Sequence, residues 1–275
     1  MLIRVFPTKT NDCPNDDYAF FGQPPLWIPE DSTEVHVSCT FTWGRARAEQ
    51  LAMQWEAIGL PVKIGGVAYG ERGEEFVAGR YLKKGITITS RGCPNRCWFC
   101  SVWKRDGDIR ELPIQDGWEI FDDNLLACSD QHIKDVFEML KRQLHRARLR
   151  GGIEPKLLKP WHVELFKEAK IQDAYLAYDT PSDLEPLHHA SRLLKEGYEH
   201  PENKFYCYVL CGFKGDTIDK AESRLREVWT LGMFPIAMFY RDETKTIDAE
   251  WARFVRGWSR PAITRKLLKT GAKAL

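Results

Sequence analysis

Residues 86–100 read ITITSRGCPNRCWFC, a short β-like run followed by three closely spaced cysteines. Cys93, Cys97 and Cys100 form a C-x3-C-x2-C pattern in a loop that directly follows the predicted strand. Three thiolates are one fewer than the four ligands that a structural zinc usually takes. An iron–sulfur cubane binds one cysteine per iron, so this triplet predicts a cubane with one iron open to another ligand.

The spacing, with the aromatic Phe99 directly before the last cysteine, resembles the signature of the radical S-adenosylmethionine (radical SAM) superfamily. The resemblance implies a [4Fe-4S] cluster whose open iron chelates the amino and carboxylate groups of S-adenosylmethionine (SAM). Reduction of the cluster would cleave SAM to a 5′-deoxyadenosyl radical that abstracts hydrogen from a substrate. The alternative for the motif is a zinc or iron–sulfur binding protein without enzymatic activity.

The composition is that of an ordinary soluble globular chain. It has 275 residues, of which 43% are hydrophobic and 29% charged, with a net charge of +1. This net charge demands neither a nucleic-acid nor a membrane partner. No apolar run approaches the roughly 18–20 residues of a membrane span, and the N-terminal residues do not resemble a secretion signal. With eight cysteines and no such signal, we expect a reduced, cytoplasmic location.

From residue 81 onward, strand-like and helix-like runs alternate. The predicted strands are 86–90, 118–122, 149–154, 173–178, 204–211 and 234–240, and the predicted helices are 130–147, 160–170, 184–196 and 216–231. Six β/α repeats predict a parallel sheet with right-handed crossovers. An eight-stranded barrel normally needs about 250 residues. We therefore expect an α/β fold, an open partial (β/α)6 TIM-like barrel over 81–245, which is also typical of the superfamily.

The N-terminal segment, residues 1–80, is predicted to be a small α/β extension. Residues 34–39 and 62–64 read as strands around a helix over 44–58. This unit resembles a shortened cobalamin-binding domain, and the chain as a whole is nearest to cobalamin-type or methylthiotransferase-type members. The segment has no Asp-x-His-x-x-Gly motif, so we favour a degenerate structural remnant over a cobalamin site.

Polar residues at the carboxyl ends of parallel strands are the candidate cofactor contacts. Asp122, Asp123 and Asn124 follow the second strand, where the superfamily binds the SAM amino group; a helix cap or Asx turn is the alternative. Glu154 and Lys156, at the third strand, could contact the SAM ribose and carboxylate, or lie on the surface.

Later strand ends supply further candidates. Asp179 would contact SAM or substrate, or serve a turn, and Gly212 would let the backbone approach the adenine. Cys211 is the better hydrogen-atom donor of two cysteines on one strand, although a core position is the alternative for both. Tyr240, at the end of the sixth strand, would face the substrate.

A basic tail over 246–275 carries Trp251, Phe254 and Trp258 at helical spacing. It could bind nucleic acid, although a solvated face with core-facing tryptophans is the alternative. Two enzymatic hypotheses follow, one with an unidentified small-molecule substrate and one with RNA or protein modified by methyl or methylthio transfer. Either would need an electron donor such as flavodoxin or ferredoxin.

Overall fold

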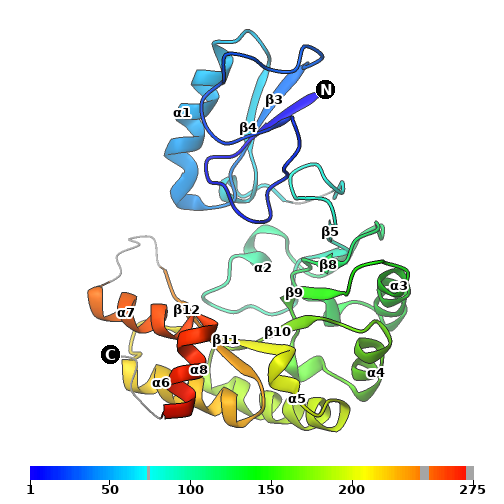
Figure 1. Ribbon diagram of the computed structural model, residues 1–275, viewed down its shortest axis with the longest axis vertical. Coiled ribbons are helices and arrows are strands. Elements are labelled where there is room, and N and C mark those ends of the chain that lie inside the picture. The colour runs from blue at the N-terminus through cyan, green and yellow to red at the C-terminus, as the bar shows by residue number, and fades with distance from the viewer. Residues whose placement is uncertain (73–74, 242–247, 271–275) are drawn as a thin grey trace.

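The computed structural model describes residues 1–72, 75–241 and 248–270, and it contains two separate parallel sheets (Figure 1). The boundary predicted at 245/246 lies outside these residues. None of the helices described is both long and apolar enough to cross a membrane.

The N-terminal sheet has the strand order β2-β1-β3-β4, with every pair parallel. Its elements are β1 (Leu2–Val5), β2 (Ala19–Phe20), β3 (Glu34–Ser38), α1 (Arg45–Glu56) and β4 (Val62–Gly65). Val35 and Val37 alternate with half-exposed residues, so one face of β3 is buried against α1. The strand–helix–strand prediction is confirmed, and β1 and β2 were not predicted.

The larger sheet has the order β12-β11-β10-β9-β8-β5, and all of its neighbours are parallel. Its strands are β5 (Ile86–Thr87), β8 (Glu119–Ile120), β9 (Arg148–Gly152), β10 (Asp173–Tyr178), β11 (Phe205–Cys211) and β12 (Phe234–Phe239). Each predicted run overlaps one of these strands, although β9 begins one residue before its run and β5 and β8 are only two residues long. The sheet is open because its end strands β5 and β12 are not paired in this order. Closure of the sheet into a partial barrel stays a prediction.

Helices alternate with these strands and cover one face of the sheet (Figure 1). They are α3 (Asp130–Lys141), α4 (Pro160–Glu168), α5 (Leu184–Gly197) and α6 (Ile218–Thr230), followed by α7 (Ala249–Trp258) and α8 (Pro261–Thr270). Ser129 and Thr217 cap α3 and α6 by accepting backbone N–H groups. Short 3-10 helices join the elements: η1 (Thr42–Gly44), η2 (Val67–Tyr69), η3 (Leu125–Ala127), η4 (Pro155–Leu157), η5 (Pro181–Asp183) and η6 (Pro201–Asn203).

The two faces of the larger sheet differ in chemistry. On the helix side, residues such as Leu149, Ala174 and Phe205 are buried in the core. On the opposite side, Tyr175 is half-buried and stacks on Tyr206 and Tyr208, with ring centroids 5.1 and 5.3 Å away. Because side chains alternate along each strand, the sheet has one apolar face and one aromatic, partly polar face.

Candidate functional site

The cysteine loop leaves β5 and is held at both ends by a small antiparallel pair, β6 (Ser90–Arg91) and β7 (Arg110–Glu111). The Cys93 N–H donates to the Gly107 carbonyl at 3.1 Å, and the Trp103 indole donates to the Cys97 carbonyl at 2.9 Å. Gly92 has φ +87°, and a Cβ there would lie 2.3 Å from the Asp108 carbonyl oxygen. Only glycine fits at the entrance to the loop.

The three thiols lie near one another and are half-buried. Burial, then the neighbouring Cys100 and Cys93, raises the pKa of Cys97 to about 11. Burial also raises the pKa of Cys100, whose sulfur accepts the Val102 N–H at 3.4 Å. The Asn124 amide donates to the Cys93 sulfur at 3.5 Å. Two of the three sulfurs, those of Cys93 and Cys100, thus have an N–H donor aimed at them, an arrangement that would stabilise thiolates bound to a metal centre.

In the described part of the chain, no group of three or more His, Cys, Asp or Glu side chains has the spacing for a single metal ion. One zinc at about 2.3 Å from each sulfur would hold its sulfurs roughly 3.8 Å apart. A cubane gives each cysteine its own iron and so needs more widely spaced sulfurs.

The Asp122–Asp123–Asn124 run joins the end of β8 to the cysteine loop. Asp122 is buried and accepts the Thr89 N–H and hydroxyl, both at 2.6 Å, and the Ser90 hydroxyl at 2.8 Å. Asp123 accepts the Gly92 N–H at 2.9 Å. Both carboxylates thus position the loop, and burial raises the pKa of each.

Asn124 differs from the two aspartates because part of its side chain is unused. It is 3% exposed, and its Oδ1 has no hydrogen-bond partner among the described residues. Its Nδ2 contacts both the Cys93 sulfur and, at 3.4 Å, the Glu154 carboxylate. An acceptor buried without a partner costs free energy unless a ligand donates to it. Within the run, Asn124 is therefore the residue with a buried group still available to a ligand.

Glu154 and Lys156 meet the cysteine loop through Asn95. The Asn95 amide donates to Glu154, and the Lys156 ammonium donates to the Asn95 Oδ1 at 2.7 Å. The structure therefore brings Glu154 and Lys156 to the site, where Lys156 keeps about half of its side chain exposed. Asn95 was not singled out from the sequence.

Asp179, at the end of β10, completes a negatively charged region. Burial, then Asp183 and Glu154, raises the pKa of Asp179 to about 7. Asp179 and Glu154 also contribute to the raised pKa of Cys97. Carboxylates near one another in a partly desolvated site favour a cationic ligand, because a cation relieves their repulsion.

Trp98, like Asn95, was not predicted as a site residue from the sequence. It is 52% exposed, and its ring contacts Phe99, Phe213 and Tyr240 at centroid distances of 5.3, 6.0 and 5.1 Å. These contacts link the cysteine loop to the ends of β11 and β12. Asn95 and Trp98 both lie between the cysteines of the motif, and this position in the sequence could have identified them as site residues.

Two other predicted residues have clear packing roles. Gly212 has φ +76°, and a Cβ there would lie 2.3 Å from the Phe239 ring. Cys211 lies in the helix-side core and is fully buried, and its sulfur donates to the Val209 carbonyl at 3.2 Å. The adenine contact of Gly212 and the hydrogen-donor role of Cys211 stay predictions, and for Cys211 the core alternative agrees with its placement.

No protein-family model matches the sequence, and no curated protein matches it. Among solved structures, the chain is similar to a radical S-adenosylmethionine methyltransferase, TsrM from Kitasatospora setae, with cobalamin and a [4Fe-4S] cluster bound. The match has a TM-score of 0.60 and 12% sequence identity, and it covers 87% of this chain and 74% of the other. At this identity the likeness shows the fold: an α/β architecture with parallel sheets, as in a radical SAM enzyme.

Proposed function

We propose that the chain is a radical SAM enzyme. The observation that carries this proposal is the convergence of the cysteine loop with Asn124, Glu154 and Asp179 at the carboxyl end of the larger sheet. A [4Fe-4S] cluster held by Cys93, Cys97 and Cys100 would supply the electron that cleaves SAM to a 5′-deoxyadenosyl radical, which abstracts a substrate hydrogen. The fold likeness to TsrM supports the same class.

The polar residues of the site would bind and orient SAM. The Asn124 Oδ1 and the Glu154 carboxylate can accept hydrogen bonds from its ammonium, and Asp179 lies close enough to Glu154 to share the positive charge. Lys156 supplies a cation for its carboxylate. Because the pKa of Asp179 is about 7, a bound cation would favour its ionised form at neutral pH.

The aromatic residues would shield the reacting atoms. Trp98, Phe99, Phe213 and Tyr240 form a continuous ring contact across the strand ends. Apolar rings exclude water, which keeps a reactive species from side reactions. Tyr240, half-buried in this group, stays the candidate to face the substrate.

Methyl transfer is the second candidate, because the solved neighbour is a methyltransferase with bound cobalamin. Only this candidate function would require cobalamin as a cofactor. The present chain lacks the Asp-x-His-x-x-Gly motif, so any cobalamin would bind without that histidine. A nucleic-acid or protein substrate, and a flavodoxin or ferredoxin donor, remain proposals at the same level.

Anaerobic reconstitution tests the proposal. We expect about four irons and four sulfides per chain, and 5′-deoxyadenosine on reduction in the presence of SAM. Cys93→Ala, Cys97→Ala and Cys100→Ala should each abolish both the bound cluster and the formation of 5′-deoxyadenosine. The matched control is Cys13→Ser, another half-buried free cysteine, which should leave both unchanged. Bound zinc with no SAM cleavage would show the non-enzymatic alternative instead.

A further inference from the structure

A large cavity separates the N-terminal sheet from the cysteine-loop side of the larger sheet. Its volume is about 580 Å³, within the roughly 300–1,000 Å³ of ordinary small-molecule sites. One wall comes from the ends of β3 and β4, including Ser38 and Gly65, and the other includes Arg91 and Phe121. None of the three motif cysteines lines it. The cavity is therefore distinct from the proposed SAM site.

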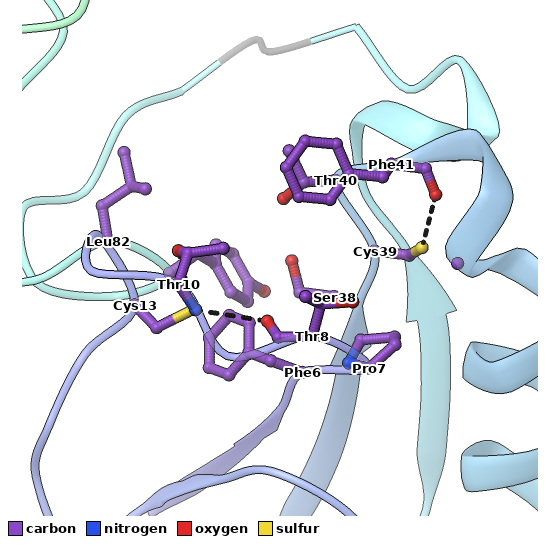
Figure 2. Close-up of a pocket in the computed structure, with 12 residues that line it drawn as sticks. Phe6, Pro7, Thr8, Thr10, Cys13, Ser38, Cys39, Thr40, Phe41 and Leu82 are labelled. Carbon is purple, nitrogen blue, oxygen red and sulfur yellow. Dashed lines mark hydrogen bonds between the residues drawn. The ribbon is translucent and has the colours of Figure 1, made fainter. Parts of the chain in front are cut away.

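The strand order places a favoured ligand position directly beside this cavity. In the order β2-β1-β3-β4, strand β2 lies on one side of β1, whereas β3 and β4 lie on the other side. The direction in which the chain adds strands to the sheet therefore reverses between β1 and β3. Open parallel sheets bind ligands outside their carboxyl ends at such a switch point. Thr10, Ser38 and Thr40 lie at this edge, where a smaller cavity of about 40 Å³ adjoins the large one (Figure 2). Hydroxyl groups therefore line the switch point.

The turn after β4 already holds an anionic group. The Gly66 N–H donates to the Glu71 carboxylate at 2.6 Å, and a Cβ on Gly65 would lie 2.3 Å from a Glu71 oxygen. Gly66 also has φ +104°, and its own Cβ would meet the Cys39 carbonyl at 2.8 Å. Two bare glycines thus form a backbone cradle that a carboxylate occupies. Glu71 is exposed, so a stronger anion can replace it.

The remaining walls combine charged side chains of both signs with apolar surface, and two of the acidic ones, Asp12 and Asp106, are paired with Lys83 and Arg105. Arg72 and Arg80 line the cavity, and neither forms an ion pair with any residue that the structure describes. Ile64 and Val67 are 37% and 41% exposed on the same wall. Aromatic side chains also line it: Phe41, Phe76, Tyr81 and Phe121. Exposed apolar and aromatic side chains favour a flat apolar body, and arginines favour phosphate.

We propose that this cavity binds a mononucleotide, a phosphate ester attached to a planar aromatic body. The phosphate replaces the Glu71 carboxylate at Gly66, in a cavity that Ser38, Thr40, Arg72 and Arg80 also line. The aromatic body lies against the ring-lined wall. The site needs neither the iron–sulfur cluster nor SAM, so it stands apart from the proposed reaction.

Calorimetric titration of the cluster-free full chain tests this site with five probes: AMP, FMN, adenosine, inorganic phosphate and cobalamin. We expect AMP or FMN to bind with a micromolar Kd, inorganic phosphate to compete weakly, and adenosine to bind at least tenfold more weakly than AMP. Excess SAM should not compete, and Cys93→Ala should bind normally. These two controls separate this site from the proposed SAM site.

Three variants sharpen the result. Arg72→Gln and Arg80→Gln should each weaken mononucleotide binding about tenfold, whereas Arg192→Gln, an exposed arginine on α5, should not. Glu71→Gln should strengthen binding several-fold because it removes the competing carboxylate, an effect that a purely structural role would not produce. Absence of mononucleotide binding overturns the proposal. The proposal is also overturned if adenosine binds as tightly as AMP, or if Arg72→Gln, Arg80→Gln and Glu71→Gln all leave mononucleotide binding unchanged. Cobalamin binding that excludes the nucleotides would overturn it as well.

Discussion

At the scale of single residues, most polar side chains near the cysteine loop are committed to one another. Asp122 uses both carboxylate oxygens to hold Thr89 and Ser90, and Asp123 holds Gly92. Asn124 keeps an unpaired buried acceptor, and Asp179 keeps a raised pKa. Residues of the first kind build the loop, and residues of the second kind are available to a ligand.

Burial also controls a histidine far from the loop. His162 on α4 is 1% exposed, and its Nδ1 accepts the Lys159 N–H at 3.1 Å. Burial, then Lys159, lowers its pKa from 6.5 to about 4. A lowered pKa means that the unfolded state binds the proton more readily. The stability from neutral His162 is therefore complete above pH 6.5 and is lost as the pH falls through about 4.

We expect His162→Asn to remove this pH dependence, because the Asn side chain does not titrate. The Oδ1 of the new side chain can still accept the Lys159 N–H, so the local hydrogen bond is kept. Between pH 7 and pH 4, the free energy of unfolding of the native protein should fall by up to about 3 kcal/mol relative to that of the variant. Urea unfolding across this range measures it. His188→Asn, at an exposed position on α5, is the control and should follow the native profile. A constant difference for His162→Asn would contradict the assignment.

At the scale of elements, the site depends on how closely β9 approaches the end of β8. Gly151 lies directly against the Asp122 backbone: a Cβ there would be 1.9 Å from the Asp122 carbonyl oxygen. The next glycine, Gly152, would place its Cβ 3.5 Å from the Asp123 carbonyl, an ordinary contact. The two adjacent glycines therefore differ sharply in the space around them.

We expect Gly151→Ala to destabilise the fold by about 2–3 kcal/mol or more, because neither backbone can yield without disturbing the sheet. It should also separate Asn124 from Glu154 and lower SAM affinity. Gly152→Ala should change stability by less than about 1 kcal/mol. Thermal unfolding and SAM titration of the two variants measure both effects, and similar losses in the pair would refute the close-approach argument.

At the scale of the whole molecule, the residues that the structure describes form two hydrophobic cores, one under each sheet. The C-terminal helices α7 and α8 belong to the second core, where Phe254, Trp258 and Leu267 are buried. Trp251 is half-buried against Phe239 and Phe254. The aromatic residues of the basic tail therefore pack inward, as the core alternative predicted, while nucleic-acid binding stays a proposal for the charged face.

Trp258→Ala should lower the free energy of unfolding by about 3–5 kcal/mol, because a large ring is lost from a closed core. Trp27→Ala is the matched control: this tryptophan is 69% exposed, so its removal should cost less than about 0.5 kcal/mol. Denaturant unfolding followed by circular dichroism gives both values. A small effect at Trp258 would mean that α7 is peripheral to the core.

The sequence by itself determined the cysteine motif, the six strand positions of the larger sheet and its helices. These signals are local: ligand spacing within one loop, apolar periodicity within one element, and short capping sequences. It could not reveal β1 and β2, since a strand as short as β2 has little pattern of its own. Nor could it identify Asn95 and Trp98 among the other residues of the motif.

The tertiary structure alone decided which strand-end residues meet, because this depends on sheet order and register. It separated the two aspartates that hold the loop from Asn124, whose acceptor is unused, and it placed Cys211 in the core. It also joined segments more than 50 residues apart, such as Asn95 and Glu154, at one site. The cavity at the N-terminal sheet exists only because strand topology and the facing cysteine-loop region bring glycines, hydroxyls and arginines around one volume.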